Sequence, residues 1–174
     1  MSTLKGEKIY LRALEPEDLE FLYQLENDEE VWYVSNTSNP FSKHVLKQYL
    51  ENSHRDIYEI KQLRFMICTV EEERSVGCVD LFDFDPKHKR AGVGVVIAKA
   101  EDRKKGYAYE ALQLLEKYGK RHLSLHQFYA SIPETNERSL ALFKKAGFEQ
   151  TGVMKDWLKE EEGFQNVVFL QILI

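Results

Sequence analysis

The chain has 174 residues and carries 24 basic against 29 acidic side chains, a formal net charge of −5. This length favours a single domain, residues 1–174, with a core large enough to fold without disulfide or metal staples. The acidic balance argues against nucleic acid as a partner, and no apolar run approaches the roughly 20 residues that span a bilayer. The first residues lack the apolar segment of a signal peptide, so we expect a cytoplasmic location and no membrane partner.

The first half of the chain predicts a strand, two helices and three further strands. Residues 8–14 alternate between apolar and polar side chains as a strand does, and Pro16 then begins a helix. Ser42 is the expected cap of a second helix. Three apolar strands follow this helix: residues 63–70, 74–84 and 91–98. Cys68 and Cys78 lie within these strands, which favours buried reduced thiols over a disulfide or a metal site.

The second half predicts helices alternating with strands. A long amphipathic helix begins near Gly106, and a strand is expected at residues 126–132. A further helix begins at Asn136 and ends at Gly147, as a C-cap glycine would end it. The last two strands are residues 148–158 and 164–174. The predicted order, β-α-α-β-β-β-α-β-α-β-β, indicates a mixed α/β fold with helices packed on a central sheet.

Three consecutive basic residues, Arg103, Lys104 and Lys105, stand directly before Gly106 in this acidic chain. The first turn of a helix leaves backbone N–H groups without partners and adds about half a positive charge. A glycine there allows a ligand to approach the backbone closely. The stretch therefore favours a phosphate or pyrophosphate ligand, with a solvated basic turn as the alternative. Neither the Walker pattern nor the dinucleotide-binding glycine pattern is present.

Two motifs resemble the signatures of one superfamily. R-x-x-G-x-A at residues 103–108 resembles the coenzyme A pyrophosphate loop of the GNAT N-acetyltransferases, and NERSLALFKKAGF at residues 136–148 resembles their second signature. The resemblance extends over essentially the whole chain. Residues 10–22 and 163–173 are similar to the branch that holds ribosomal-protein N-terminal acetyltransferases and polyamine (spermidine) N-acetyltransferases. It implies a single-domain GNAT-like fold, α/β, with a mixed, largely antiparallel central sheet flanked by helices.

The resemblance implies acetyl-CoA as cosubstrate and assigns residues to it. A strand backbone would pair with the pantetheine arm, the basic loop would hold the pyrophosphate through its N–H groups, and an asparagine would bond the cofactor near its amide end. The residues that match these positions are Val95, Val96 and Ile97 in the strand, Arg103, Lys104, Lys105, Gly106, Tyr107 and Ala108 in the loop, and Asn136.

Two positions depart from the catalytic pattern of the family. Phe143 stands where many members place a tyrosine that protonates the thiolate, and Gly92 stands where relatives often carry a glutamate base. Asp80 and Asp83 match positions that are acidic in the polyamine branch, so both are candidate base or amine-binding groups. Regular strand alternation would place Asp83 on the same face as Leu81.

The implied reaction is direct attack of a primary amine, from a polyamine or a protein N-terminus, on the thioester. Against a polyamine acceptor, residues 33–42 carry none of the glutamates that polyamine enzymes have between their first two helices. An open alternative is a coenzyme A-binding sensor or partner module whose catalysis is impaired, since Phe143 and Gly92 are both atypical. A homo-oligomer is a further expectation, because the apolar last strand could form an interface if its edge is uncovered.

Overall fold

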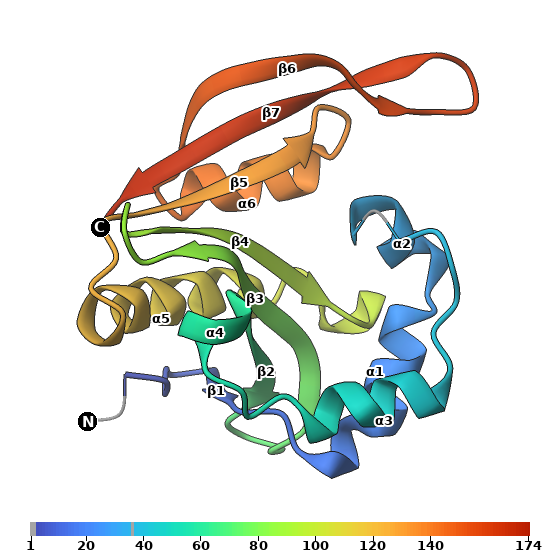
Figure 1. Cartoon of the computed structure of the whole chain (residues 1–174), viewed down its shortest axis with the longest axis vertical. Coiled ribbons are helices and arrows are strands. Elements are labelled where there is room, and N and C mark those ends of the chain that lie inside the picture. The colour runs from blue at the N-terminus through green and yellow to red at the C-terminus, as the bar shows by residue number, and fades with distance from the viewer. Residues whose placement is uncertain (1–2, 36) are drawn as a thin grey trace.

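A single seven-stranded sheet organises the molecule (Figure 1). The computed structural model describes residues 3–35 and 37–174, and at positions 33 and 34 only the backbone. The strand order in the sheet is β1-β2-β3-β4-β5-β7-β6. All neighbouring strands are antiparallel except β4 and β5, which are parallel, so the predicted mixed, largely antiparallel sheet is confirmed. The strands are β1 (Ile9–Arg12), β2 (Leu63–Thr69), β3 (Ser75–Asp85), β4 (Arg90–Ile97), β5 (Gln127–Pro133), β6 (Glu149–Lys159) and β7 (Phe164–Leu173).

The helices follow the predicted order, with two short additions. They are α1 (Leu19–Glu26), α2 (Glu29–Ser35), α3 (Lys43–Glu51), α4 (Ile57–Ile60), α5 (Tyr107–His122) and α6 (Glu137–Lys145). Short 3-10 turns precede α1 and α5. The sequence did not predict α2 and α4, because elements of one or two turns are too short to show a helical period. Local polar groups begin them instead: Asp28 accepts a hydrogen bond from the backbone of Glu30, and Asp56 accepts one from that of Tyr58.

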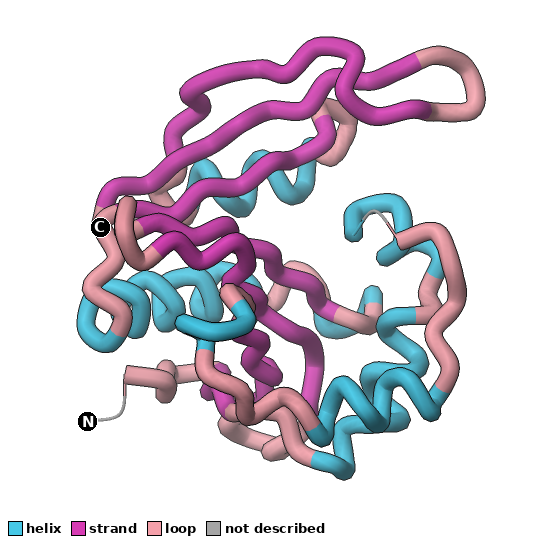
Figure 2. Tube along the Cα trace, viewed as in Figure 1, coloured by secondary structure: helices cyan, strands magenta, loops and turns pink. Residues whose placement is uncertain are grey.

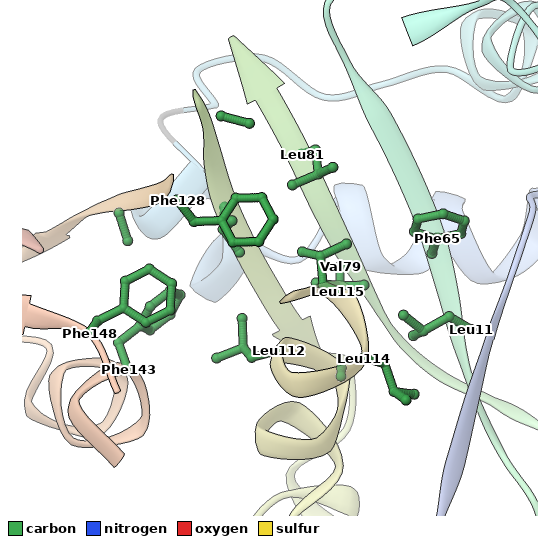
Figure 3. Packing of buried hydrophobic residues seen from close by; sticks show 14 of the residues in the cluster. Leu11, Phe65, Val79, Leu81, Leu112, Leu114, Leu115, Phe128, Phe143 and Phe148 are labelled. Atoms are coloured by element: carbon green, nitrogen blue, oxygen red, sulfur yellow. The ribbon is translucent and has the colours of Figure 1, made fainter. Parts of the chain in front are cut away.

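Helices cover both faces of the sheet. Alternate side chains of β2 and β3 serve the two faces, since Phe65 and Val79 join a core beneath α5, whereas Met66 and Cys78 join a second core beneath α1 and α3. Figure 3 shows Leu115 of α5 in the first of these cores, close to Val79. Cys68 and Cys78 are both buried and free, as the sequence predicted.

The sheet is split between its two parallel strands. β4 and β5 pair only at Arg90↔Gln127, Ala91↔Phe128 and Gly92↔Tyr129. Beyond these pairs β4 continues along β3 and β5 continues along β7, so the two strands diverge (Figure 2). The backbone of β4 after Gly92 therefore faces no strand on its β5 side within the described chain.

β3 leaves regular alternation at Asp83. The φ angle of this residue is 47°, and the pairing of β3 with β4 shifts between Phe82 and Asp85. Leu81 and Phe84 both reach the core beneath α5 although they are three residues apart, and Asp83 is exposed. The expectation that Asp83 shares the face of Leu81 was wrong, because the bulge inserts one extra residue into the strand.

The final strand is not an edge of the sheet. β7 lies between β5 and β6, which leaves β6 as the outermost strand. The condition for an interface through the edge of the last strand, that this edge is uncovered, is therefore not met. The sequence could not separate the two strands of this hairpin, since hairpin pairing alone does not show which of them lies against the rest of the sheet.

Candidate functional site

Two cavities meet beside the divergent part of β4. The strand cavity, of about 410 Å³, lies between the separated ends of β4 and β5. The loop cavity, of about 490 Å³, follows the segment that leads into α5. Five residues line both cavities and mark where they join: Val31, Val95, Val96, Asn136 and Ser139.

The loop cavity is formed by a backbone shaped for an anion. Gly106 is the N-cap of α5 with a φ of 87°, and Lys104 before it also has a positive φ of 61°. The first turn of α5, whose N–H groups have no helical partner, contributes Gly106, Tyr107 and Ala108 to the cavity lining. Four basic side chains line the cavity against two acidic ones, Glu30 and Asp102; the basic set is Arg103, Lys104, Arg138 and Lys145. The charge and the free N–H groups suit a ligand with several negative charges.

The basic residues of the loop differ in where their side chains lie. Arg103 lines the cavity, and its guanidinium lies 3.8 Å from the carboxylate of Glu30. Lys105 does not line the cavity, and its ammonium lies 3.5 Å from the carboxylate of Asp102. The carbonyl of Lys105 accepts a hydrogen bond of 3.1 Å from the Lys8 ammonium, which holds the loop against the start of the chain.

A buried ion pair fixes the start of this loop. Asp102 has a side chain only 1% exposed and is bound by both terminal nitrogens of Arg74, at 2.6 and 2.8 Å. The hydrogen bonds from Arg74 hold the pKa of Asp102 below its ordinary value and outweigh the effect of burial, which acts in the opposite direction. The pair ties the turn before the loop to the β2–β3 connection. No local pattern predicts this ion pair, since Arg74 stands in an ordinary charged turn.

The strand cavity has a charged wall built around one arginine. Arg64 binds Asp80 through two nitrogens, at 2.6 and 3.1 Å, and also contacts the carboxylate of Glu26. All three side chains line the cavity and are less than a fifth exposed. Burial alone would lower the pKa of Arg64, but Asp80 outweighs it and the pKa is raised. Each oxygen of Asp80 thus accepts a hydrogen bond from Arg64, which holds this carboxylate against the wall of the cavity.

Asp83 lies away from Asp80 and does not line the strand cavity. It accepts a hydrogen bond from the hydroxyl of Tyr129, whose pKa is raised by burial and by this carboxylate. Tyr129 packs edge-to-face against Phe82 with the ring centroids 6.3 Å apart. The bulge thus turns Asp83 towards the aromatic group of Phe82 and Tyr129.

Gly92 has no room for a side chain. A Cβ atom built there would lie 2.2 Å from the ring of Phe82. Phe82 lines the strand cavity, so its ring occupies the space that a side chain at position 92 would need. A glutamate side chain at this position would therefore overlap Phe82 of the neighbouring strand β3.

Helix α6 contributes Asn136 and Phe143 to the site. Asn136 caps the helix by accepting a hydrogen bond of 3.1 Å from the backbone N–H of Ser139. Phe143 is 3% exposed and packs edge-to-face on Phe148 with centroids 4.9 Å apart, as seen in Figure 3, while lining the strand cavity. Tyr107 and Tyr109 line only the loop cavity. No tyrosine whose side chain is described lines the strand cavity.

The structure brings most of the predicted site residues together. Of the predicted cofactor residues, every one except Lys105 lines the loop cavity, and Asp80 and Phe143 line the strand cavity. Sequence reasoning missed the basic residues Arg138 and Lys145, although their spacing of seven on a helix indicates a shared face. Glu26 lies in an acidic run, residues 26–30, just before the loop where such carboxylates were expected, but no sequence pattern pairs it with Arg64, which was missed.

Among the described residues, no helix is long and apolar enough to cross a membrane.

Comparisons with known proteins agree with this geometry. The sequence matches the acetyltransferase (GNAT) domain family over residues 8–149. It is 30% identical over 148 residues to a spermidine N(1)-acetyltransferase of Escherichia coli, covering 83% of this chain and 74% of that enzyme.

Solved structures show the same fold. The chain is similar to a spermidine N-acetyltransferase from Vibrio cholerae in complex with CoA and spermine, with a TM-score of 0.85 and 23% identity over 97% of this chain and 96% of that one. A dodecameric structure of spermidine N-acetyltransferase from the same organism has a TM-score of 0.78 and 25% identity, covering 97% of this chain and 95% of that one.

Proposed function

The chain belongs to the acetyltransferase (GNAT) domain family and is an acetyl-CoA-dependent N-acetyltransferase, and from this premise we propose that its acceptor is a small aliphatic polyamine bound in the strand cavity. The observation that carries the proposal is the pair of carboxylates, Glu26 and Asp80, on the wall of an otherwise largely apolar cavity. A polyamine combines cationic nitrogens with methylene segments and so matches both parts of this lining.

The cofactor is proposed to lie across both cavities. Its pyrophosphate would bind the N–H groups and cations of Arg103 to Ala108, where the charge of the loop cavity is favourable. Its pantetheine arm would pair with the backbone of Val95, Val96 and Ile97, which β5 leaves uncovered. Asn136 would bond the arm near its amide end. The thioester would then stand where the two cavities join.

The acceptor would enter from the other side of this junction. One ammonium would rest near Glu26 and Asp80, while a second nitrogen, in its neutral form, would attack the thioester carbon. Arg64 already balances part of the carboxylate charge, so the wall would attract a cation without holding it as strongly as two unpaired carboxylates. Residues 33–42 lack the glutamates that polyamine enzymes carry between their first two helices. We propose that Glu26 and Asp80 take over their role of attracting a cationic acceptor.

The reaction needs a neutral amine, a polarised thioester and a leaving thiolate. Deprotonating an alkyl ammonium of pKa about 10.4 costs roughly 4–5 kcal/mol at pH 7. Holding the amine against the thioester can offset about 7–11 kcal/mol of the barrier, so positioning outweighs that cost. We propose that Asp80 binds the amine and assists its deprotonation when the pairing with Arg64 loosens, and that Asp83 acts only through Tyr129.

The test is a thiol-release assay with acetyl-CoA and a panel of spermidine, short N-terminal peptides, amino acids and aminoglycosides. We expect spermidine to be turned over with the highest kcat/KM. Turnover of peptides without turnover of spermidine would contradict the polyamine assignment and leave the acetyltransferase activity intact.

The matched variants Asp80→Asn and Asp83→Asn separate the two candidate carboxylates. Asp80→Asn is expected to raise the acceptor KM about 10-fold, the effect of losing one charge-assisted contact, while the KM for acetyl-CoA stays constant. Asp83→Asn is expected to leave the acceptor KM within about twofold, because the side chain lies outside the strand cavity. The opposite ranking would move the amine site to Asp83.

The sensor alternative retains one specific argument. Phe143 has no donor, and the ring of Phe82 fills the space beside Gly92, so neither customary catalytic side chain is present. A module of this kind would show thermal stabilisation by coenzyme A with no turnover of any amine in the panel. The thiol-release assay therefore distinguishes the two candidates directly.

Self-association is proposed through the β6–β7 hairpin. β6 is an outermost strand, and Val153, Trp157 and Phe164 on this hairpin are 42%, 61% and 58% exposed. Exposed aromatic groups beside a free strand edge favour pairing with another copy. The dodecameric relative gives independent support for an assembly of identical chains.

A further inference from the structure

One residue with a hydroxyl side chain, to which no role has been assigned, lies at the junction of the two cavities. Ser139 lines both the strand cavity and the loop cavity. It stands in the first turn of α6, four residues and therefore one turn before Phe143, on the same side of the helix. We propose that Ser139 is a catalytic residue whose hydroxyl donates a hydrogen bond to the coenzyme A sulfur as the thiolate departs. This rests on the cofactor placement proposed above.

The other residues at the junction do not offer a hydroxyl donor. Val31, Val95 and Val96 are aliphatic. The side-chain oxygen of Asn136 is occupied by the backbone N–H of Ser139, and its amide is expected to hold the pantetheine arm. Phe143 has a buried ring without a donor. Among the described side chains, Ser139 is thus the one residue with a hydroxyl group that lines both cavities.

The local structure also holds Ser139 in place. Its backbone N–H is bound by Asn136 at 3.1 Å, which fixes the first turn of α6 and with it the base of the Ser139 side chain. The N-terminal turn of this nine-residue helix adds a partial positive charge in the same place. A sulfur that gains negative charge at the junction would therefore be stabilised by the hydroxyl of Ser139 and by the positive end of the α6 dipole.

The role is hydrogen bonding and not complete proton transfer. The amine nitrogen gives its electron pair to the carbonyl carbon, the C–S bond breaks, and its electron pair leaves on the sulfur. The acetylated nitrogen loses one proton to water, and the thiolate later takes one proton from water, so the products are an acetamide and a thiol. Because an ordinary thiol has a pKa of about 8.5, the thiolate can depart unprotonated once a donor stabilises its charge.

The first experiment follows the sulfur itself and needs no acceptor. The thiol pKa of bound coenzyme A is measured by ultraviolet absorbance of the thiolate in the unmodified enzyme, in Ser139→Ala and in Ser139→Thr. We expect the pKa of the bound thiol to rise by about one to two pH units in Ser139→Ala, and Ser139→Thr to keep the original value, because threonine retains the hydroxyl. An unchanged thiol pKa in Ser139→Ala would overturn the proposal.

The second experiment uses the preferred amine from the acceptor panel. Ser139→Ala is expected to lower kcat on the order of 100-fold, as for loss of one donor to a developing anion, with the KM for acetyl-CoA within about threefold. Ser53→Ala, a half-buried serine that lines neither cavity, serves as the control and is expected to keep kcat. Equal loss of kcat in both variants, or a change confined to KM, would show that Ser139 has only a structural role. The thiol titration tests the role of Ser139 even if no polyamine is acetylated. Failure of the Ser139 proposal can therefore be distinguished from failure of the polyamine proposal.

Discussion

At the scale of single residues, Gly92 and Phe82 depend on each other. They face one another in the β3–β4 register, and the phenyl ring lies where a side chain at position 92 would begin. While Phe82 keeps this position, no side chain fits at position 92. A glutamate introduced at position 92 alone would overlap the ring of Phe82, so we expect it to disturb the local packing and not to act as a base.

We expect Gly92→Ala to destabilise the fold by about 1–3 kcal/mol, because the new methyl overlaps the Phe82 ring. Phe82→Ala combined with Gly92→Ala should recover part of that loss, relative to the sum of the single changes, in a denaturant double-mutant cycle. Gly94→Ala is the control, since its Cβ would lie 3.8 Å from the same ring, at ordinary contact distance. Additive effects of the first pair would contradict the steric coupling.

A second glycine, Gly106, is expected to control cofactor affinity. Gly106→Glu adds bulk and a negative charge to the loop that lines the loop cavity, so binding of acetyl-CoA should become undetectable by calorimetry. Gly163→Glu makes the same change at a position that also has positive φ, 93° against 87°, but lies in the β6–β7 turn. Both variants carry the backbone strain of a side chain at positive φ, and only the first should lose the cofactor. Retained affinity in Gly106→Glu would remove the pyrophosphate from this loop.

At the scale of elements, the loop before α5 is held in position from outside. The pair of Asp102 and Arg74 connects the turn preceding the loop to the hairpin of β2 and β3. We expect Asp102→Asn to destabilise the fold by roughly 1–3 kcal/mol, as for a weakened charged hydrogen bond, and to raise the KM for acetyl-CoA more than it lowers kcat. Asp18→Asn, which weakens a similar pair with Arg12 away from both cavities, is the control that should affect stability alone.

The pH dependence of this variant has a definite sign. The pKa of Asp102 is lower in the folded chain than in the unfolded one, so its contribution to stability is complete above the unfolded value of about 3.9. That contribution is lost as the pH falls from about 4 through the folded pKa. The difference in unfolding free energy between the unmodified chain and Asp102→Asn should therefore be constant near neutral pH and shrink below about pH 4. A difference that persists unchanged at acid pH would show that the ion pair is not its source.

The sequence predicted elements better than it predicted the acidic wall. Local patterns predicted three features that are confirmed: the helix α5 from its spacing of apolar residues, the glycine at its start, and the order of the strands along the chain. The bulge at Asp83 does not follow from local pattern, because it depends on Phe84 reaching the core beneath α5. The cluster of Glu26, Arg64 and Asp80 joins three separate elements, and only the folded sheet brings them together.

At the scale of the whole molecule, the β6–β7 hairpin is the least covered part of the sheet. Its connecting turn projects past the end of β5 (Figure 1). If copies associate here, Trp157→Glu should shift the sedimentation distribution towards smaller species, because the introduced charge would lie in the interface where Trp157, 61% exposed in the single chain, would be covered. Tyr58→Glu, a substitution at another half-exposed aromatic residue remote from this hairpin, is the control. An unaltered distribution in Trp157→Glu would place any interface elsewhere.

The divergence of β4 and β5 has a consequence for the lifetime of the protein. The part of the sheet that holds β5, β7 and β6 joins the remainder through a short run of parallel pairs, so opening there exposes backbone that a protease can cut. A pantetheine arm along β4 would close this seam, and a ligand at 100 times its Kd adds about 2.7 kcal/mol of stability. We therefore expect slower proteolysis and slower amide exchange in β4 when acetyl-CoA is abundant. The quantity of enzyme in a cell would then rise and fall with the supply of its own acetyl donor.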